Sequence, residues 1–225
     1  MNLFAEAGQF LTDPANWTGA TGIPQRMLEH VGYSLLTMVI ALVIAVPLGL
    51  WVGHSGRGGG VVVGLAGALR SLPTLGLLTL FTLLMGLGLM PPILALVLLA
   101  IPPILSGTYS GIAAVSPALV DAARAMGMTE SQTLFRVEVP VALPVILGGI
   151  RNAALQVLAT VTIVAYINLG GLGRYLIDGL AVRDYARMLG SVVLVAVLAL
   201  AADAVLALVQ RLVTSPGLAT AGDRP

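Results

Sequence analysis

Long apolar runs alternate with short polar stretches along this chain, and the alternation predicts helices that cross a membrane. Each run has more than twenty residues, which at about 1.5 Å per residue is enough to span a hydrocarbon core of roughly 30 Å. The five runs cover about residues 31–52, 61–84, 91–112, 142–167 and 188–212. We therefore expect an all-α polytopic membrane protein with five transmembrane helices in one domain, residues 31–212.

This domain is flanked by a short segment at each end. Residues 1–30 carry acidic residues before any continuous apolar run and lack a basic n-region, so we do not expect a signal peptide. The aromatic residues Phe4, Phe10 and Trp17 favour a short helix at the membrane interface, followed by a Gly/Thr-rich loop. Residues 213–225 are expected to form a Pro/Gly tail.

Proline interrupts two of the apolar runs. Arg70-Ser71-Leu72-Pro73 divides the second run, and Pro102-Pro103 is expected to break the third helix in its middle. A proline at membrane depth frees backbone carbonyls, which is tolerated where protein or a water-filled cavity satisfies them. The pattern is typical of a translocation path, and equally of ordinary packing kinks.

One long polar stretch, Asp121 to Pro140, lies between the third and fourth runs and holds five charged residues in twenty positions. Apolar residues between the charges predict an amphipathic helix that lies flat on a membrane face or on a partner protein. We expect Ser116 and Pro117 to begin the helical segment at residues 117–140, and Gly127 to form a turn between two short helices. Pro140 is expected to end the second of them.

Seven positions of this stretch resemble the EAA loop of ABC-importer permeases. That loop reads Glu-Ala-Ala, three residues, Gly, nine residues, Ile, one residue, Leu-Pro; the spacing here is the same, with Asp for Glu and Val for Ile and Leu. In that family the loop forms coupling helices that dock into a groove on a separate ATPase subunit. An amphipathic loop without a partner is the alternative. The resemblance implies coupling roles for Asp121, Ala122, Ala123, Arg124, Gly127, Met128, Arg136, Val137, Val139 and Pro140.

Other segments resemble the osmoprotectant permeases of bacterial importers for glycine betaine, choline and carnitine. These segments are SLPTLGLL (71–78), PPILSGTYSGI (102–112), AARAMGM (122–128), VPVALPVILGGIRNA (139–153) and NLGGLGRYLIDGL (168–180). Methionine-type permeases share the five-helix plan of this type I importer fold and are the nearest alternative. Arg70 is a departure, because the osmoprotectant relatives typically carry a polar uncharged residue there.

The resemblance also implies partners and a location. The partners are a cytoplasmic ATPase dimer that binds ATP and Mg, a second permease copy or paralogue, and an extracytoplasmic substrate-binding protein. The chain itself is expected to hold no cofactor. Arginines number five on one side of the predicted spans and four on the other, so charge does not decide the orientation. Since the EAA loop must meet a cytoplasmic ATPase, we expect a bacterial cytoplasmic membrane protein with its N-terminus outside and its C-terminus inside.

Composition supports a membrane protein and excludes several classes of function. The chain is 58% hydrophobic and only 9% charged, with a mean hydropathy of +1.00, whereas soluble domains are about a quarter charged. A net charge of +1 argues against a nucleic-acid partner, and the lack of cysteine excludes disulfides and zinc–thiolate sites. The spans contain no zinc-protease motif, acidic pair or Ser–His arrangement, so we expect no enzyme and no metal site. A secondary transporter and a non-transporting scaffold stay open as alternatives.

A quaternary ammonium zwitterion cannot cross hydrocarbon unaided, so its path needs weak and distributed polar contacts. Neutral polar residues in or near the spans are the candidates for such contacts, although each alone also fits a helix-packing hydrogen bond. The path candidates are Ser71, Pro73, Thr74, Thr108, Tyr109, Asn152, Gln156, Thr160, Thr162 and Asn168.

Three charged residues lie within predicted spans, at a depth of about 13 Å from the inner surface by helix rise. They are Arg70, Arg151 and Asp203. Charges at that depth usually face the protein interior and find partners, so we hypothesise an Arg151–Asp203 ion pair with Arg70 as a competing donor. Snorkelling of each arginine to the interface is the alternative. An Asp203→Asn variant that assembles and transports like the wild type would contradict this ion-pair hypothesis.

Overall fold

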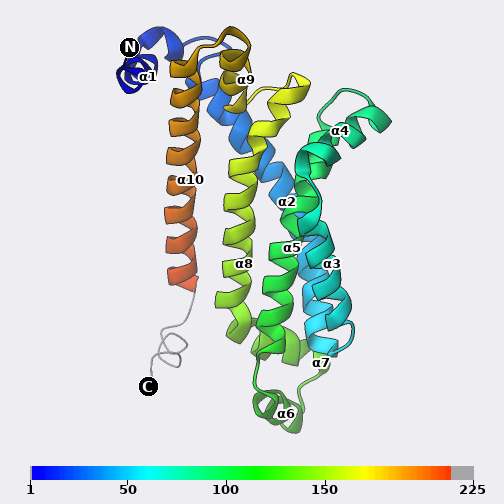
Figure 1. The fold of residues 1–225 in the computed structure, drawn as a ribbon. Coiled ribbons are helices and arrows are strands. Elements are labelled where there is room, and N and C mark those ends of the chain that lie inside the picture. Colours follow the sequence, from blue (N-terminus) through cyan, green and yellow to red (C-terminus); the bar gives the residue numbers. More distant parts are fainter. Residues whose placement is uncertain (1, 214–225) are drawn as a thin grey trace. The chain divides into compact units, whose positions relative to one another are not determined.

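The computed structural model describes residues 2–213, and within that range it contains helices and no strand. The helices in chain order are α1 (Leu3–Thr12), η1 (Pro14–Trp17), α2 (Ile23–Ser55), α3 (Gly59–Ser71), α4 (Thr74–Met85), α5 (Met90–Ala113), α6 (Pro117–Ala125), α7 (Glu130–Thr133), η2 (Leu134–Glu138), α8 (Val139–Thr160), η3 (Val161–Ile167), α9 (Gly173–Val182) and α10 (Tyr185–Val213) (Figure 1). Of these, η1 and η3 are 3₁₀-helices and η2 is a π-helix. The all-α class is confirmed, and residues 214–225 of the predicted tail lie outside the described range.

Four helical stretches among the described residues are long and apolar enough to cross a membrane: α2, α5, the continuous run Glu130–Ile167 and α10. A fifth span is obtained only if α3 and α4 count as one, and this pair is bent by 84° at Leu72 and Pro73, as in a broken span or a re-entrant loop. The five stretches correspond to the five predicted runs. The short helix expected near the N-terminus is α1, and another short helix, α9, precedes the last span.

The first span starts earlier than the apolar run suggested, at Ile23 rather than near residue 31. Pro24 is compatible with the first helical turn, where a backbone N–H has no intrahelical partner in any case. The two charges that follow neutralise each other within the helix, because Arg26 Nη1 lies 2.9 Å from Glu29 Oε2. A charge pair with this spacing allows the helix to continue into the polar segment.

Two expectations about proline were wrong. Pro102-Pro103 does not break α5, which is continuous from Met90 to Ala113. Pro140 does not end its helix either, since the helical run continues from Glu130 through Thr160. Proline removes a backbone donor but its fixed φ fits a helix, so a buried helix with neighbours can retain it.

Directly before Pro140 the helix widens into the π-turn η2, in which the N–H of Val139 bonds to the carbonyl of Leu134. Such a turn inserts one extra residue into a helix and changes which carbonyls need a donor. The proline therefore modifies the helix at η2 instead of terminating it.

The described residues form two compact units. Unit 1 comprises residues 2–40, 72–99 and 154–203, and unit 2 comprises residues 41–71, 100–153 and 204–213. The core of unit 1 is built around Ile23, Leu172, Tyr175 and Leu194. The Tyr175 hydroxyl also donates a 2.6 Å hydrogen bond to the carbonyl of Thr21, so α9 is tied to the loop that precedes α2.

Unit 2 is held together by close helix packing at glycines. A Cβ added to Gly149 of α8 would lie 2.7 Å from the carbonyl oxygen of Pro103, and one added to Gly107 of α5 would lie 2.8 Å from Gly149 Cα. Gly49 and Gly53 of α2 face the side chains of Thr108 and Ile112 in the same way, at 2.6 and 2.7 Å. Small residues at helix contacts let the helix backbones approach closely in membrane proteins.

Candidate coupling site and translocation path

The predicted coupling segment begins with α6, which follows the end of α5 in unit 2 (Figure 1). Ser116 is its N-cap residue and Pro117 its first helical residue, as expected, although the Ser116 hydroxyl makes no capping hydrogen bond. Ala123 is buried, whereas Asp121 and Arg124 are exposed. The helix therefore packs one small side chain inward and presents its charges outward.

A Schellman turn at Gly127 ends α6. Gly127 has a φ of +84°, a left-handed conformation that residues with a Cβ rarely adopt. Its N–H donates to the carbonyl of Arg124 at 2.9 Å, and the N–H of Met128 donates to that of Ala123 at 3.2 Å. Gly127 is thus the turn between two short helices that the sequence placed there. We call residues 117–133, from α6 through α7, the elbow.

A capping box begins α7, and sequence reasoning missed it. The Thr129 hydroxyl accepts a hydrogen bond from the N–H of Gln132 at 3.3 Å, and the Gln132 side chain accepts one from the N–H of Thr129 at 2.9 Å. The signal was present, since threonine followed three residues later by glutamine is the pattern of this motif. The box gives a helix of only four residues a defined start.

Within the elbow, a charge pair joins α6 to α7. Arg124 binds Glu130 with two hydrogen bonds, Nε to Oε1 at 3.1 Å and Nη2 to Oε2 at 2.9 Å, and Asp121 lies 3.9 Å from Arg124. The hydrogen bonds to Glu130 raise the pKa of Arg124 further above its ordinary value. Both groups are exposed, and Glu130 takes the Nε and Nη2 donors of Arg124, so Nη1 is the part of the guanidinium that a partner can reach without displacing Glu130.

The remaining coupling candidates lie along the next helical stretch. Val137 and Val139 are half-buried, while Arg136 and Pro140 are exposed. Met128 is half-buried beside the turn. Their proposed contacts with an ATPase stay predictions.

A histidine link to the coupling segment is the second feature that sequence reasoning missed. His54, in the last turn of α2, places Nδ1 2.7 Å from Oε2 of Glu138 and Nε2 3.2 Å from Oε2 of Glu130. No local pattern reveals this contact, because His54 and Glu138 are 84 residues apart in the chain.

Several of the path candidates bond to their own helices. The hydroxyls of Ser71, Thr160 and Thr162 donate to carbonyls three or four residues earlier in the chain. Thr108 does the same and is fully buried against Gly49, which agrees with a packing role. Asn168, in a left-handed conformation at the end of η3, accepts a hydrogen bond from Arg174.

The other path candidates differ in exposure and belong to different units. Tyr109 is half-buried in unit 2 and its hydroxyl approaches Gly59, whereas Asn152 is exposed. Pro73, Thr74 and Gln156 belong to unit 1. Unit 1 contains a hollow of about 230 Å³ that Thr162 lines together with apolar side chains. The role of these residues in a path stays a prediction.

Of the three charged residues predicted within spans, Arg70 is exposed in the last turn of α3, where the helix dipole stabilises a cation. Arg151 lies on α8 and Asp203 on α10, and each has an interaction partner. Their pairing with each other stays a prediction.

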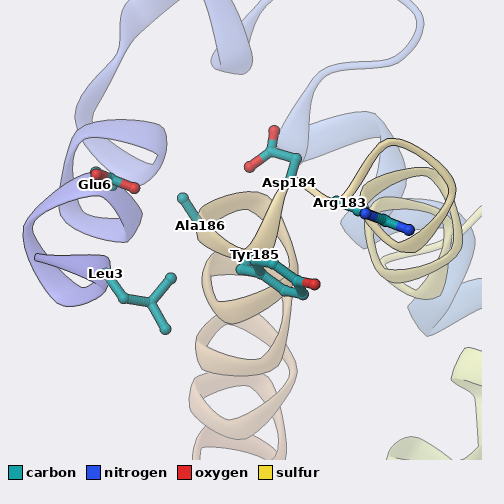
Figure 2. Close-up of a pocket in the computed structure, with 6 residues that line it drawn as sticks. All are labelled: Leu3, Glu6, Arg183, Asp184, Tyr185 and Ala186. Carbon is teal, nitrogen blue, oxygen red and sulfur yellow. The ribbon is translucent and has the colours of Figure 1, made fainter. Parts of the chain in front are cut away.

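The groove between α1 and the start of α10 is a further hollow of unit 1, with a volume of about 300 Å³. Figure 2 shows Leu3 and Glu6 of α1 facing Ala186, while the side chains of Arg183 and Tyr185 point away from the groove. Among the described residues no cluster of His, Asp or Glu has the arrangement of a metal site.

The described residues form an all-helical fold with four or five apolar spans and a polar helical elbow between two of them, which is the arrangement expected for the transmembrane permease subunit of an ABC importer. Residues 45–215 match the family described as "Binding-protein-dependent transport system inner membrane component". The chain belongs to this family. It is therefore an inner-membrane component of a transport system.

Comparison with curated proteins finds relatives that are named as transport permeases. The chain is 37% identical over 190 residues to the glycine betaine/carnitine/choline transport system permease protein OpuCB of Bacillus subtilis, covering 84% of this chain and 88% of that protein. It is 35% identical over 193 residues to the choline transport system permease protein OpuBB of the same organism, with 86% and 89% covered. The osmoprotectant import permease protein OsmW of Salmonella typhimurium is 33% identical over 195 residues, with 84% and 91% covered.

Comparison with solved structures confirms the fold. A chain of the MetNI methionine ABC transporter in an inward-facing conformation superposes with a TM-score of 0.76, covering 91% of this chain and all of that one. The two chains are 22% identical, so the likeness concerns the fold alone. The predicted methionine-permease-like fold is correct.

Proposed function

We propose that this chain is the permease subunit of an ATP-driven importer for quaternary-ammonium osmoprotectants, glycine betaine, choline or carnitine. One observation carries this proposal: relatives more than 30% identical over more than four-fifths of the chain are named as permeases for glycine betaine, carnitine and choline, or for osmoprotectants. ATP and Mg would be bound by the partner ATPase, and the permease would supply the path.

Coupling would run through the elbow. Closure of the ATPase pair on ATP would draw two elbows together and shift the permease between inward-open and outward-open states, provided that each state makes different contacts. The Schellman turn and the capping box give the elbow a defined shape. The coupling candidates from Asp121 to Pro140 would form the docking surface.

Three partners follow from this proposal. A second permease copy or paralogue would enclose the path. An extracytoplasmic binding protein would select the solute. The elbow would face the cytoplasm, which places the N-terminus outside and the C-terminus inside.

The path itself would act by weak contacts. The neutral candidates Thr74, Tyr109, Asn152 and Gln156 would donate hydrogen bonds to the carboxylate of the solute without trapping it, whereas Ser71 and Thr160, whose hydroxyls donate to their own helices, would only accept from a solute hydroxyl. A ring of charged side chains, as in ion pores, would instead hold a charged solute tightly and slow its release.

The decisive experiment is ATP-dependent uptake into proteoliposomes that contain the permease with its ATPase and binding protein. Labelled glycine betaine, choline, carnitine and methionine are compared. A matched set carries Gly127→Asp, and its control is Gly86→Asp, because both glycines have a φ of +84° and open space around a Cβ. Gly86 follows α4, outside the elbow.

We expect uptake of a quaternary amine that Gly127→Asp abolishes and Gly86→Asp retains. Uptake of methionine alone would preserve the importer class and contradict the substrate. Ion-driven uptake by the permease alone would favour a secondary transporter. No uptake of any solute by the assembled complex would favour a scaffold.

A further inference from the structure

His54 joins the coupling segment to the first span through two carboxylates. Glu138, in the π-turn η2, is only 5% exposed, and a buried carboxylate is costly unless it is paired. His54 Nδ1 lies 2.7 Å from its Oε2, and the other ring nitrogen lies 3.2 Å from Oε2 of Glu130 in α7. One imidazole therefore contacts both ends of the segment from Glu130 to Glu138.

The chemistry of the ring determines which protonation state satisfies both contacts. A neutral imidazole has one N–H and one lone pair, whereas an ionised carboxylate only accepts hydrogen bonds. Two carboxylates can each receive a hydrogen bond from His54 only when the ring is an imidazolium. A neutral ring would keep one N–H for one glutamate and turn a lone pair toward the other.

The two contacts differ in strength. The contact with Glu138 is shorter, and both side chains in it are largely buried, with 17% and 6% exposed. The side chain of Glu130 is 63% exposed, and it is already held by Arg124. Deprotonation of His54 would therefore release Glu130 and retain Glu138.

His54 is also attached to a well-packed backbone. Its neighbour Gly53 lies against Ile112 of α5, where a Cβ would come within 2.7 Å. The charged groups facing His54 are Glu130 of α7 and Glu138 of η2; Arg124 of α6 shares Oε2 of Glu130 with His54, and Arg57 follows in the loop after α2. A displacement of the elbow thus reaches the end of α2 through Arg124, Glu130 and His54.

We propose that His54 is a positioning residue whose imidazolium fastens the elbow to the end of α2 through Glu130 and Glu138, and thereby makes ATP-coupled import depend on the pH at the ATPase side. The link is complete when His54 is protonated and loses its Glu130 contact as the pH rises. The transport part of this proposal rests on the proposed function, whereas the link itself does not.

The link is tested first without transport. Because the chain has no cysteine, spin labels can be placed at Ser55→Cys and Ser131→Cys, two exposed positions beside His54 and Glu130. The distance distribution between the labels is measured in nanodiscs at about pH 6 and about pH 8.5, across the range in which imidazoles titrate. We expect it to broaden at the higher pH in the wild type and to be the same at both in His54→Asn.

The second test is uptake by the full complex over the same pH range. An exposed ion-pair contact of this kind is worth roughly a two- to fivefold change in an equilibrium, so wild-type uptake should fall about that much as pH rises, relative to His54→Asn. Asparagine keeps a donor near the Nδ1 position and does not titrate. Glu130→Gln, an exposed change that should fold normally, should remove the same pH dependence, and the control Arg57→Gln should retain it.

Two results would overturn the proposal: a label distance that is the same at both pH values in the wild type, or a His54→Asn pH profile identical to the wild-type profile. If no solute is transported at any pH, the proposed function fails and the label distances still decide on the link. If uptake occurs but the link shows no pH effect, the proposed function stands and His54 has no such role.

Discussion

At the scale of single residues, glycine decides how closely the helices of unit 2 approach one another. Gly148 and Gly149 are adjacent on α8 and show the difference. A Cβ on Gly149 would meet the carbonyl oxygen of Pro103 at 2.7 Å, while a Cβ on Gly148 would meet nothing within 4 Å. The contact at Gly149 is with backbone, which cannot move aside as a side chain can.

We expect Gly149→Ala to destabilise the protein by about 1–3 kcal/mol, because an added methyl group in a packed interior forces the neighbours apart. Gly148→Ala is the matched control and should be neutral or slightly stabilising, since alanine is the better helix former by about 1 kcal/mol. Thermal unfolding in detergent measures the difference. Equal melting temperatures for both variants would contradict the close packing at Gly149.

At the scale of elements, the elbow is a short helix, α6, followed by α7, the first turn of the long helical run that starts at Glu130. With nine residues, α6 is too short to be stable alone. The Schellman turn at Gly127 and the capping box at Thr129 supply the missing hydrogen bonds between them.

Thr129→Ala should remove the cap at a cost of about 1 kcal/mol, which is roughly a fivefold shift toward a frayed α7. ATP-dependent uptake and ATPase stimulation by the permease should both fall, by up to that factor. Thr129→Ser keeps the hydroxyl and should behave as the wild type. A Thr129→Ala variant with full coupling would show that the shape of α7 does not matter.

Much of this element could be predicted from the sequence, because its signals are local. Pro117, Gly127 and the charges between them correctly marked a helix start, a turn and an exposed face. Pro140 misled, since a π-turn let the helix continue past it. The contact of His54 with Glu138 was beyond sequence reasoning, because it depends on tertiary packing between α2 and η2, which local periodicity does not encode.

At the scale of the whole molecule, the apolar spans were the strongest prediction, and the described residues contain four helices of spanning length plus the bent pair α3 and α4 in place of the second run. Length and hydropathy alone are sufficient for this, because the bilayer sets a minimum length for every span. Pro102-Pro103 was misjudged for the opposite reason: whether a proline breaks a helix depends on the neighbours that pack against it.

The proposed orientation gives a whole-molecule prediction. In right-side-out vesicles a membrane-impermeant maleimide should label a single cysteine at Thr18, in the loop before α2, and should leave one at Ser131, in α7, unlabelled. Permeabilisation should expose Ser131→Cys. The chain without cysteine is its own background control. The reverse labelling pattern would place the elbow outside and exclude coupling to a cytoplasmic ATPase.

The glycine contacts of unit 2 have a mechanical consequence. Where Gly107 and Gly149 meet, backbone touches backbone, and there are no side-chain torsions that can rotate to absorb a displacement. The contacting segments of α5 and α8 are therefore stiff at this contact and move together. A displacement of the elbow, which lies between α5 and α8 in the chain, would therefore move both contacting segments together.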